Sequence, residues 1–108
     1  MSESRQTEIL EKALGTTSLT QVIFGVTDAT TTAKAANSTR KYLLIQNDSN
    51  QAIYIKIGAA AVLNDGILLA ASGGSFEMSY LKGNLDTRVV NAIHAAAGQT
   101  KNLLVIEG

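Results

Sequence analysis

The sequence of 108 residues contains no cysteine, no proline and no tryptophan, and it has a single histidine. Without cysteine, the chain cannot form disulfide bonds, thiolate metal sites or cysteine nucleophiles. Without proline, no exposed strand edge is blocked by that residue. A two-histidine metal site cannot form within one chain, and any imidazole chemistry depends on His94. Stability must therefore come from packing.

Charge is also scarce. Nine Lys and Arg residues balance nine Asp and Glu residues, and charged residues make up 17% of the chain. A chain with zero net charge has no broad field to attract phosphate backbones, so we expect no nucleic-acid partner. The 45% hydrophobic content predicts a single folded domain. Self-repulsion is too weak to keep copies apart, so we expect a homo-oligomer.

Long hydrophobic runs are missing as well. Residues 1–12 are polar and mixed in charge, unlike the basic start and apolar run of a secretory leader. The longest apolar stretches, such as residues 67–71, are far shorter than the roughly 20 residues that cross a bilayer. These features predict a soluble chain that has no membrane partner and no standard leader.

The N-terminal segment has helical spacing. Ile9, Leu10, Ala13 and Leu14 fall on one helical face, and Gly15 stands where a helix would stop. A helix of about ten residues is marginal alone, so it needs a surface to lie on. We expect residues 1–19 to form an arm before a β domain of residues 20–108. The hypothesis is that Ile9, Leu10 and Leu14 dock on a neighbouring subunit or on a larger shell. Docking on the chain's own domain is an equal alternative.

From residue 16 onward, short apolar segments alternate with clusters of Gly, Asn, Asp, Ser and Thr, a pattern typical of successive strands. Seven or eight strands in about 90 residues predict an all-β fold, an antiparallel sandwich or a jelly-roll-like barrel. The sequence leaves sandwich and barrel open. The predicted strands are 21–26, 40–46, 52–57, 66–70, 75–79, 88–94 and 102–107, with a possible further strand within 31–36.

Two hairpins are predicted from polar turns. Residues 47–51 are expected to join the strand at 42–46 to the strand at 53–57, in which Ile53, Ile55 and Ile57 share one face. Residues 95–99, with a positive φ at Gly98, are expected to join 89–93 to 103–106. Several strands are apolar on both faces, as at 22–24, 43–45, 67–69 and 103–106. A small sandwich cannot cover both faces of its sheets, so a neighbouring subunit is the expected second cover.

Catalytic chemistry has little support. His94 ends a predicted strand and is expected to be a packed or surface residue.

The turn at residues 47–50 offers oxygens for calcium but lacks the EF-hand spacing, so a structural turn is favoured. Gly73 and Gly74 precede a strand and not a helix, which favours a turn or bulge over a phosphate loop. The acidic residues show no spacing that pairs them for glycoside hydrolysis: Asp28, Asp48, Asp65, Glu77, Asp86 and Glu107.

Aromatic residues make up only 5% of the chain, which disfavours platforms for stacking bases or sugars. Residues 40–42 and 54–56 could together form a small basic and aromatic patch across the first predicted hairpin. The simpler interpretation is that the lysine stems cover apolar surface there.

Residues 40–47 and 53–58, together with 66–69, 73–77 and the closing 104–108, resemble small virion structural proteins of tailed phages. The resemblance covers residues 40–108 and implies a capsid decoration or cement protein, or a head-fibre component. It further implies a trimeric β-sandwich or jelly roll on the surface of the phage particle, made in the host cytoplasm, with the major capsid protein as partner. No family site is carried over to this chain.

Three functions remain open at this point. A non-catalytic virion module predicts oligomers, a receptor-binding or carbohydrate-binding module predicts an exposed aromatic cleft, and a small cupin-like enzyme predicts a metal cluster. The scarcity of histidine, cysteine and aromatic residues favours the first function. We therefore expect no catalytic residues, no cofactor and no bound metal.

Overall fold

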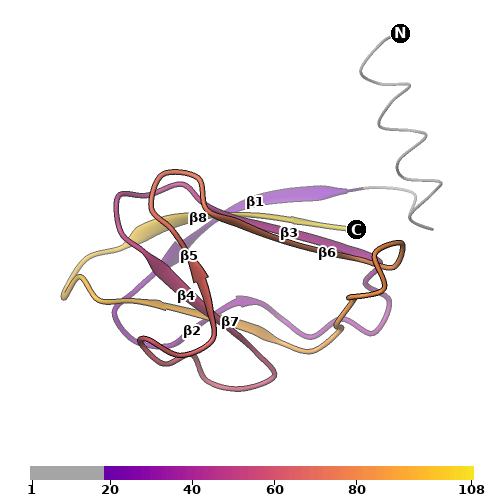
Figure 1. Ribbon diagram of the computed structural model, residues 1–108, viewed down its shortest axis with the longest axis horizontal. Coiled ribbons are helices and arrows are strands. Elements are labelled where there is room, and N and C mark those ends of the chain that lie inside the picture. The colour runs from indigo at the N-terminus through magenta and orange to yellow at the C-terminus, as the bar shows by residue number, and fades with distance from the viewer. Residues whose placement is uncertain (1–18) are drawn as a thin grey trace, which may run out of the picture.

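The computed structural model describes residues 19–108, which form two four-stranded antiparallel sheets facing each other (Figure 1). This arrangement confirms the predicted all-β class and shows a sandwich. The predicted N-terminal helix, with Ile9, Leu10 and Leu14, lies outside the described residues. The strands are β1 (Thr20–Val26), β2 (Thr31–Lys34), β3 (Tyr42–Asn47), β4 (Ile53–Ile57), β5 (Ile67–Leu69), β6 (Ser75–Ser79), β7 (Val90–His94) and β8 (Lys101–Glu107).

The strand order joins distant parts of the chain. The first sheet has the order β1-β8-β3-β6 and the second has the order β2-β7-β4-β5. Thus β1 pairs with β8, β2 with β7, β3 with β6 and β4 with β5, all antiparallel. An antiparallel ribbon rolled up in this way has the strand order of a jelly roll.

Both predicted hairpins are wrong. β3 pairs with β6 and β8, whereas β4 pairs with β5 and β7, so residues 48–52 cross from one sheet to the other. Residues 95–100 likewise cross from β7 in the second sheet to β8 in the first. The turn chemistry itself is as predicted, since Gly98 has a φ of 71°. A short polar turn can reverse a strand within a sheet or arch over to the facing sheet, and here it does the latter.

The core lies between the two sheets. Ile53 and Ile55 are fully buried and Ile57 packs against them, which confirms the predicted alternation along β4. The facing sheet contributes Leu43, Ile45, Leu103 and Val105. These side chains form one cluster, as expected for a single domain of this size.

The outer faces of the two sheets differ. The β4–β5 connection folds over the outer face of the second sheet, where Ala59 O accepts a hydrogen bond from Asn91 Nδ2 (2.6 Å) and Ala61 N donates to Thr30 Oγ1 (2.8 Å). Ile93, which faces outward on β7, is only 9% exposed. On the outer face of the first sheet, Ile23 is 55% exposed. The chain itself therefore covers the outer face at β7, whereas Leu68 on β5 and Ile23 on β1 stay exposed on the outer faces of the two sheets.

Candidate functional site

One end of the sandwich is held by Arg40, which is only 1% exposed. Its Nε donates to Glu107 Oε2 (2.7 Å), and Lys34 Nζ lies 3.5 Å from the other oxygen of that carboxylate. The two terminal nitrogens donate to three backbone carbonyls, those of Ala35 (2.8 Å), Asp86 (2.8 Å) and Arg88 (3.0 Å). Arg40 thus ties the β2–β3 and β6–β7 connections to the last strand. We call this the charged end.

Arg40 is therefore no part of an exposed basic and aromatic patch. Tyr42 and Tyr54 lie on different sheets, so the two halves of the suggested patch do not meet. Tyr42 is buried and donates its hydroxyl to Glu77, which also pairs with Lys82. Burial, and then the Glu77 carboxylate, raise the pKa of Tyr42 to about 12. Lys82 first, and Tyr42 second, lower the pKa of Glu77.

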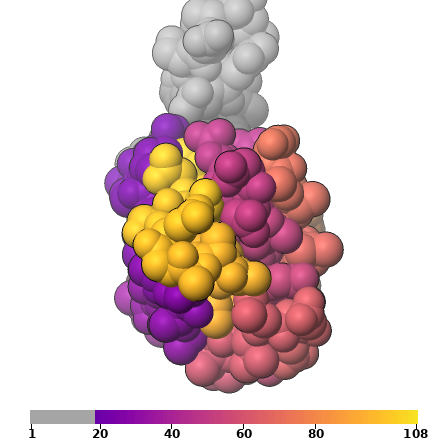
Figure 2. Space-filling model, turned by 90° about the vertical axis from the view of Figure 1, so that its left-hand side faces the viewer, coloured from indigo at the N-terminus to yellow at the C-terminus, as the bar shows by residue number. Residues whose placement is uncertain are grey.

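At the opposite end, His94 is fully buried and both of its ring nitrogens are engaged. Nδ1 accepts from Ala96 N–H (3.0 Å), so Nε2 carries the proton of a neutral ring. Nε2 lies 2.9 Å from the carbonyl oxygens of both Val26 and Gln99. The ring thereby joins Val26, at the point where β1 ends, to the β7–β8 connection. Figure 2 shows this end of the molecule, with the yellow 95–100 segment at its surface. Of the two positions expected for His94, packed or at the surface, the structure shows the packed one.

Asn47 is the second anchor of this end and is also fully buried. Its Nδ2 donates to the carbonyls of Gln51 (2.6 Å) and Leu69 (3.0 Å), and its Oδ1 accepts from the backbone and hydroxyl of Ser49. Its backbone also bonds to Gly73 and Gly74. A single amide thus shapes the β3–β4 arch and fixes it to the β5–β6 connection. We call the end held by Asn47 and His94 the neutral end.

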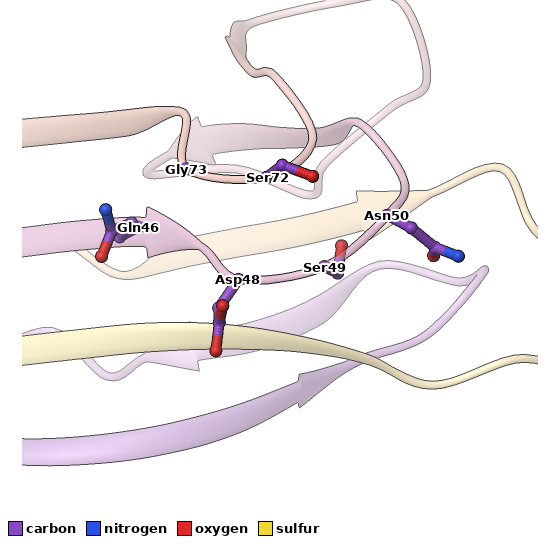
Figure 3. A pocket seen from close by; sticks show the side chains of 6 residues that line it. All are labelled: Gln46, Asp48, Ser49, Asn50, Ser72 and Gly73. Carbon is purple, nitrogen blue, oxygen red and sulfur yellow. The ribbon is translucent and has the colours of Figure 1, made fainter.

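The possible calcium turn does not converge. Asn47 is buried in the protein. Asp48 and Asn50 are exposed, and their side chains point in different directions (Figure 3). An open hollow of about 580 Å³ lies beside this turn, lined by Gln46, Asp48, Ser49, Asn50, Ser72 and Gly73. Its lining offers amides, hydroxyls and one carboxylate but no aromatic ring. The hollow therefore lacks the stacking surface that a carbohydrate platform would use.

The four edge strands of the sandwich differ in how open they are. At β6, the side chain of Asn84 occupies the free edge, because its Oδ1 accepts from Ser79 N and its Nδ2 donates to Glu77 O, both at 3.0 Å. β5 has only three residues, and β2 has four, with a register shift and a lysine at its end. Short strands, bulges and charges all hinder pairing with another strand.

β1 has none of these protections. It has seven residues, none of them charged, in unbroken register with β8. Within residues 19–108, no strand pairs with its other edge. Its first half is also bare on both faces, since Val22 on the inner face is 49% exposed and Ile23 on the outer face is 55% exposed. The apolar residues of β1 are evident in the sequence, but no local signal marks it as an edge strand.

No family model, no curated protein and no solved structure matches the chain.

Four of the acidic side chains from residue 19 onward pair with cations. Glu107 pairs with Arg40, Glu77 with Lys82, Asp65 with Lys56 and Asp86 with Arg88. In the part of the chain from residue 19 onward, no three metal-ligating His, Asp or Glu side chains gather. Over the same residues, every buried side-chain nitrogen and oxygen has a hydrogen-bond partner. A search of these residues for a helix that could cross a membrane finds none.

Proposed function

We propose that this chain is a non-catalytic structural subunit of a tailed-phage virion. In this role it is a decoration protein that binds the shell surface and stabilises it through contacts with the major capsid protein and with other copies of itself. The phage setting comes from the resemblance of residues 40–108 to small virion proteins, and the structural role comes from the arrangement of the side chains.

One observation carries the structural role: the buried polar side chains bond within the fold, while two adjacent apolar side chains are exposed on an edge strand that is open to pairing. Arg40, Asn47 and His94 are buried and bonded to backbone carbonyls of the connections, so they stabilise the fold. Val22 and Ile23 are half exposed on β1, the one edge strand that nothing within residues 19–108 protects from pairing. An exposed apolar strand edge favours association with another protein surface.

A second candidate function is a head-fibre or tail module that binds a receptor or carbohydrate. The hollow beside the β3–β4 arch favours it, because amide and hydroxyl groups can bind sugar hydroxyls. The lack of an aromatic ring in that lining makes it the weaker candidate.

Light scattering of the purified full chain tests the structural role. We expect a multiple of 11.3 kDa, and a monomer at micromolar concentration would reject an assembling subunit. Immunogold electron microscopy of purified virions tests the setting. Label on the head supports decoration, label on the tail supports the receptor-binding alternative, and particles without label reject both.

A further inference from the structure

We propose that two copies of this chain pair through the free edges of their β1 strands, antiparallel across a two-fold axis at Ile23, to form a continuous eight-stranded sheet. This inference rests on the proposed function and names the partner and the surface. It follows from comparing the edges of the sandwich, because β1 is the one edge strand that has length, regular register and no charge.

A second copy fits this edge because β1 is complementary to itself. The strand is uncharged, so pairing two copies of it places no like charges opposite each other along β1. Seven residues facing seven give roughly six to eight backbone hydrogen bonds, since alternate pairs in an antiparallel ladder exchange two bonds each. A two-fold arrangement uses the same patch on both copies and closes without leaving a further open edge on β1.

The register follows from the uneven cover of β1. Val26 is fully buried and Phe24 packs against the core, but Val22 on the same inner face is 49% exposed. With Ile23 opposite Ile23 of the second copy, Val22 lies beside Phe24 of the second copy. The exposed first half of each strand, residues 20–23, then lies beside the more buried second half, residues 24–26, of the other copy. Paired residues of an antiparallel ladder share a face, so both apolar positions gain a neighbour.

The cysteine-free sequence allows a direct test in the full chain. In Ile23→Cys, the two thiols face each other across the axis with Cβ atoms roughly 4.5–5.5 Å apart, close to disulfide range. Leu68→Cys is a matched control, because Leu68 is also 55% exposed and outward-facing on an edge strand of the other sheet. Under mild oxidation, we expect the cross-linked dimer to be the main species for Ile23→Cys and a minor one for Leu68→Cys. Equal cross-linking of the two variants, or none at residue 23, would overturn the pairing.

Lysine variants supply the second measurement. Ile23→Lys places two positive charges against each other at the axis and should reduce the mass by light scattering to 11.3 kDa, whereas Leu68→Lys should keep the mass of the unmodified chain. If the unmodified chain is an oligomer that Ile23→Lys does not dissociate, the β1 pairing is wrong and the structural role stands. If the unmodified chain is itself a monomer, the structural role fails too.

Discussion

At both ends of the sandwich, buried side chains bond to backbone carbonyls and so hold the connections in place, but the chemistry of the two ends differs. At the charged end, one guanidinium bonds to three carbonyls and a carboxylate. At the neutral end, an amide and an uncharged imidazole divide the task, and each fixes a different pair of connections. A buried charge that loses its partner costs far more than a buried neutral group does. The two ends should therefore differ in their response to mutation and to pH.

The largest effect is expected at the charged end. Arg40→Ala should lower the free energy of unfolding by about 3–5 kcal/mol, because the largely buried Glu107 keeps only its longer contact with Lys34 and three carbonyls lose their donor. Urea denaturation measures this loss. The control is Arg88→Ala, whose side chain is 67% exposed and whose removal should cost under about 0.5 kcal/mol. Equal losses for the two variants would contradict the role given to Arg40.

A smaller loss is expected at the neutral end. Asn47→Ala should cost roughly 2–3 kcal/mol, because the buried carbonyl of Leu69 and the arch lose hydrogen bonds but no charge is stranded. Asn50→Ala, at an exposed position in the same arch, should change stability by under about 0.5 kcal/mol. A loss for Asn47→Ala as large as that for Arg40→Ala would remove the distinction between the ends.

Alkaline pH sharpens the comparison further. The pKa of Tyr42 is raised from 10.0 to about 12, so the folded state holds a proton that the unfolded state releases. The stabilisation from this group is full below pH 10.0 and is lost as pH rises through about 12. Tyr42→Phe should therefore flatten the fall in stability over this window. Urea denaturation at about pH 9 and about pH 11 measures it, and an unchanged slope would show that the phenol is not protected.

The smallest effect is expected in acid. The pKa of Glu77 is lowered, first by Lys82 and then by Tyr42, from the ordinary glutamate value of 4.5. A carboxyl group whose pKa is lowered on folding stabilises the fold at pH values above 4.5. This contribution of Glu77 is lost as the pH falls through its pKa in the folded state. Glu77→Gln should therefore reduce the acid sensitivity of the thermal midpoint slightly, because this partly exposed pair is screened by solvent. A steeper acid dependence in Glu77→Gln would contradict the assignment.

The strands were predictable from sequence because the signal for a strand is local. All eight observed strands overlap predicted segments, and 75–79 matches β6 at both ends. The alternation of Ile53 and Ile55 depends only on the period of a strand against a core, which each segment carries by itself.

The pairing of the strands was not predictable from the same signals. The Asn47 side chain makes the local turn that suggested a hairpin. The same side chain also bonds to Leu69 O, far along the chain, in a turn that arches between the two sheets. Arg40 has no local feature that marks it as buried, since Glu107 and the carbonyls of Asp86 and Arg88 belong to distant segments. The openness of β1 is likewise a property of the strand order. The positions of Ile9, Leu10 and Leu14 remain predictions.

The order of the strands also determines when, during synthesis, the fold can be completed. β8 leaves the ribosome after the other seven described strands, yet it lies between β1 and β3 in the first sheet. Until synthesis reaches Glu107, β1 has no partner within its own sheet, and the nascent chain keeps both edges of that apolar strand open. Such distant pairing is slow to form, so the newly made chain passes through a stage in which premature contact between copies is a hazard.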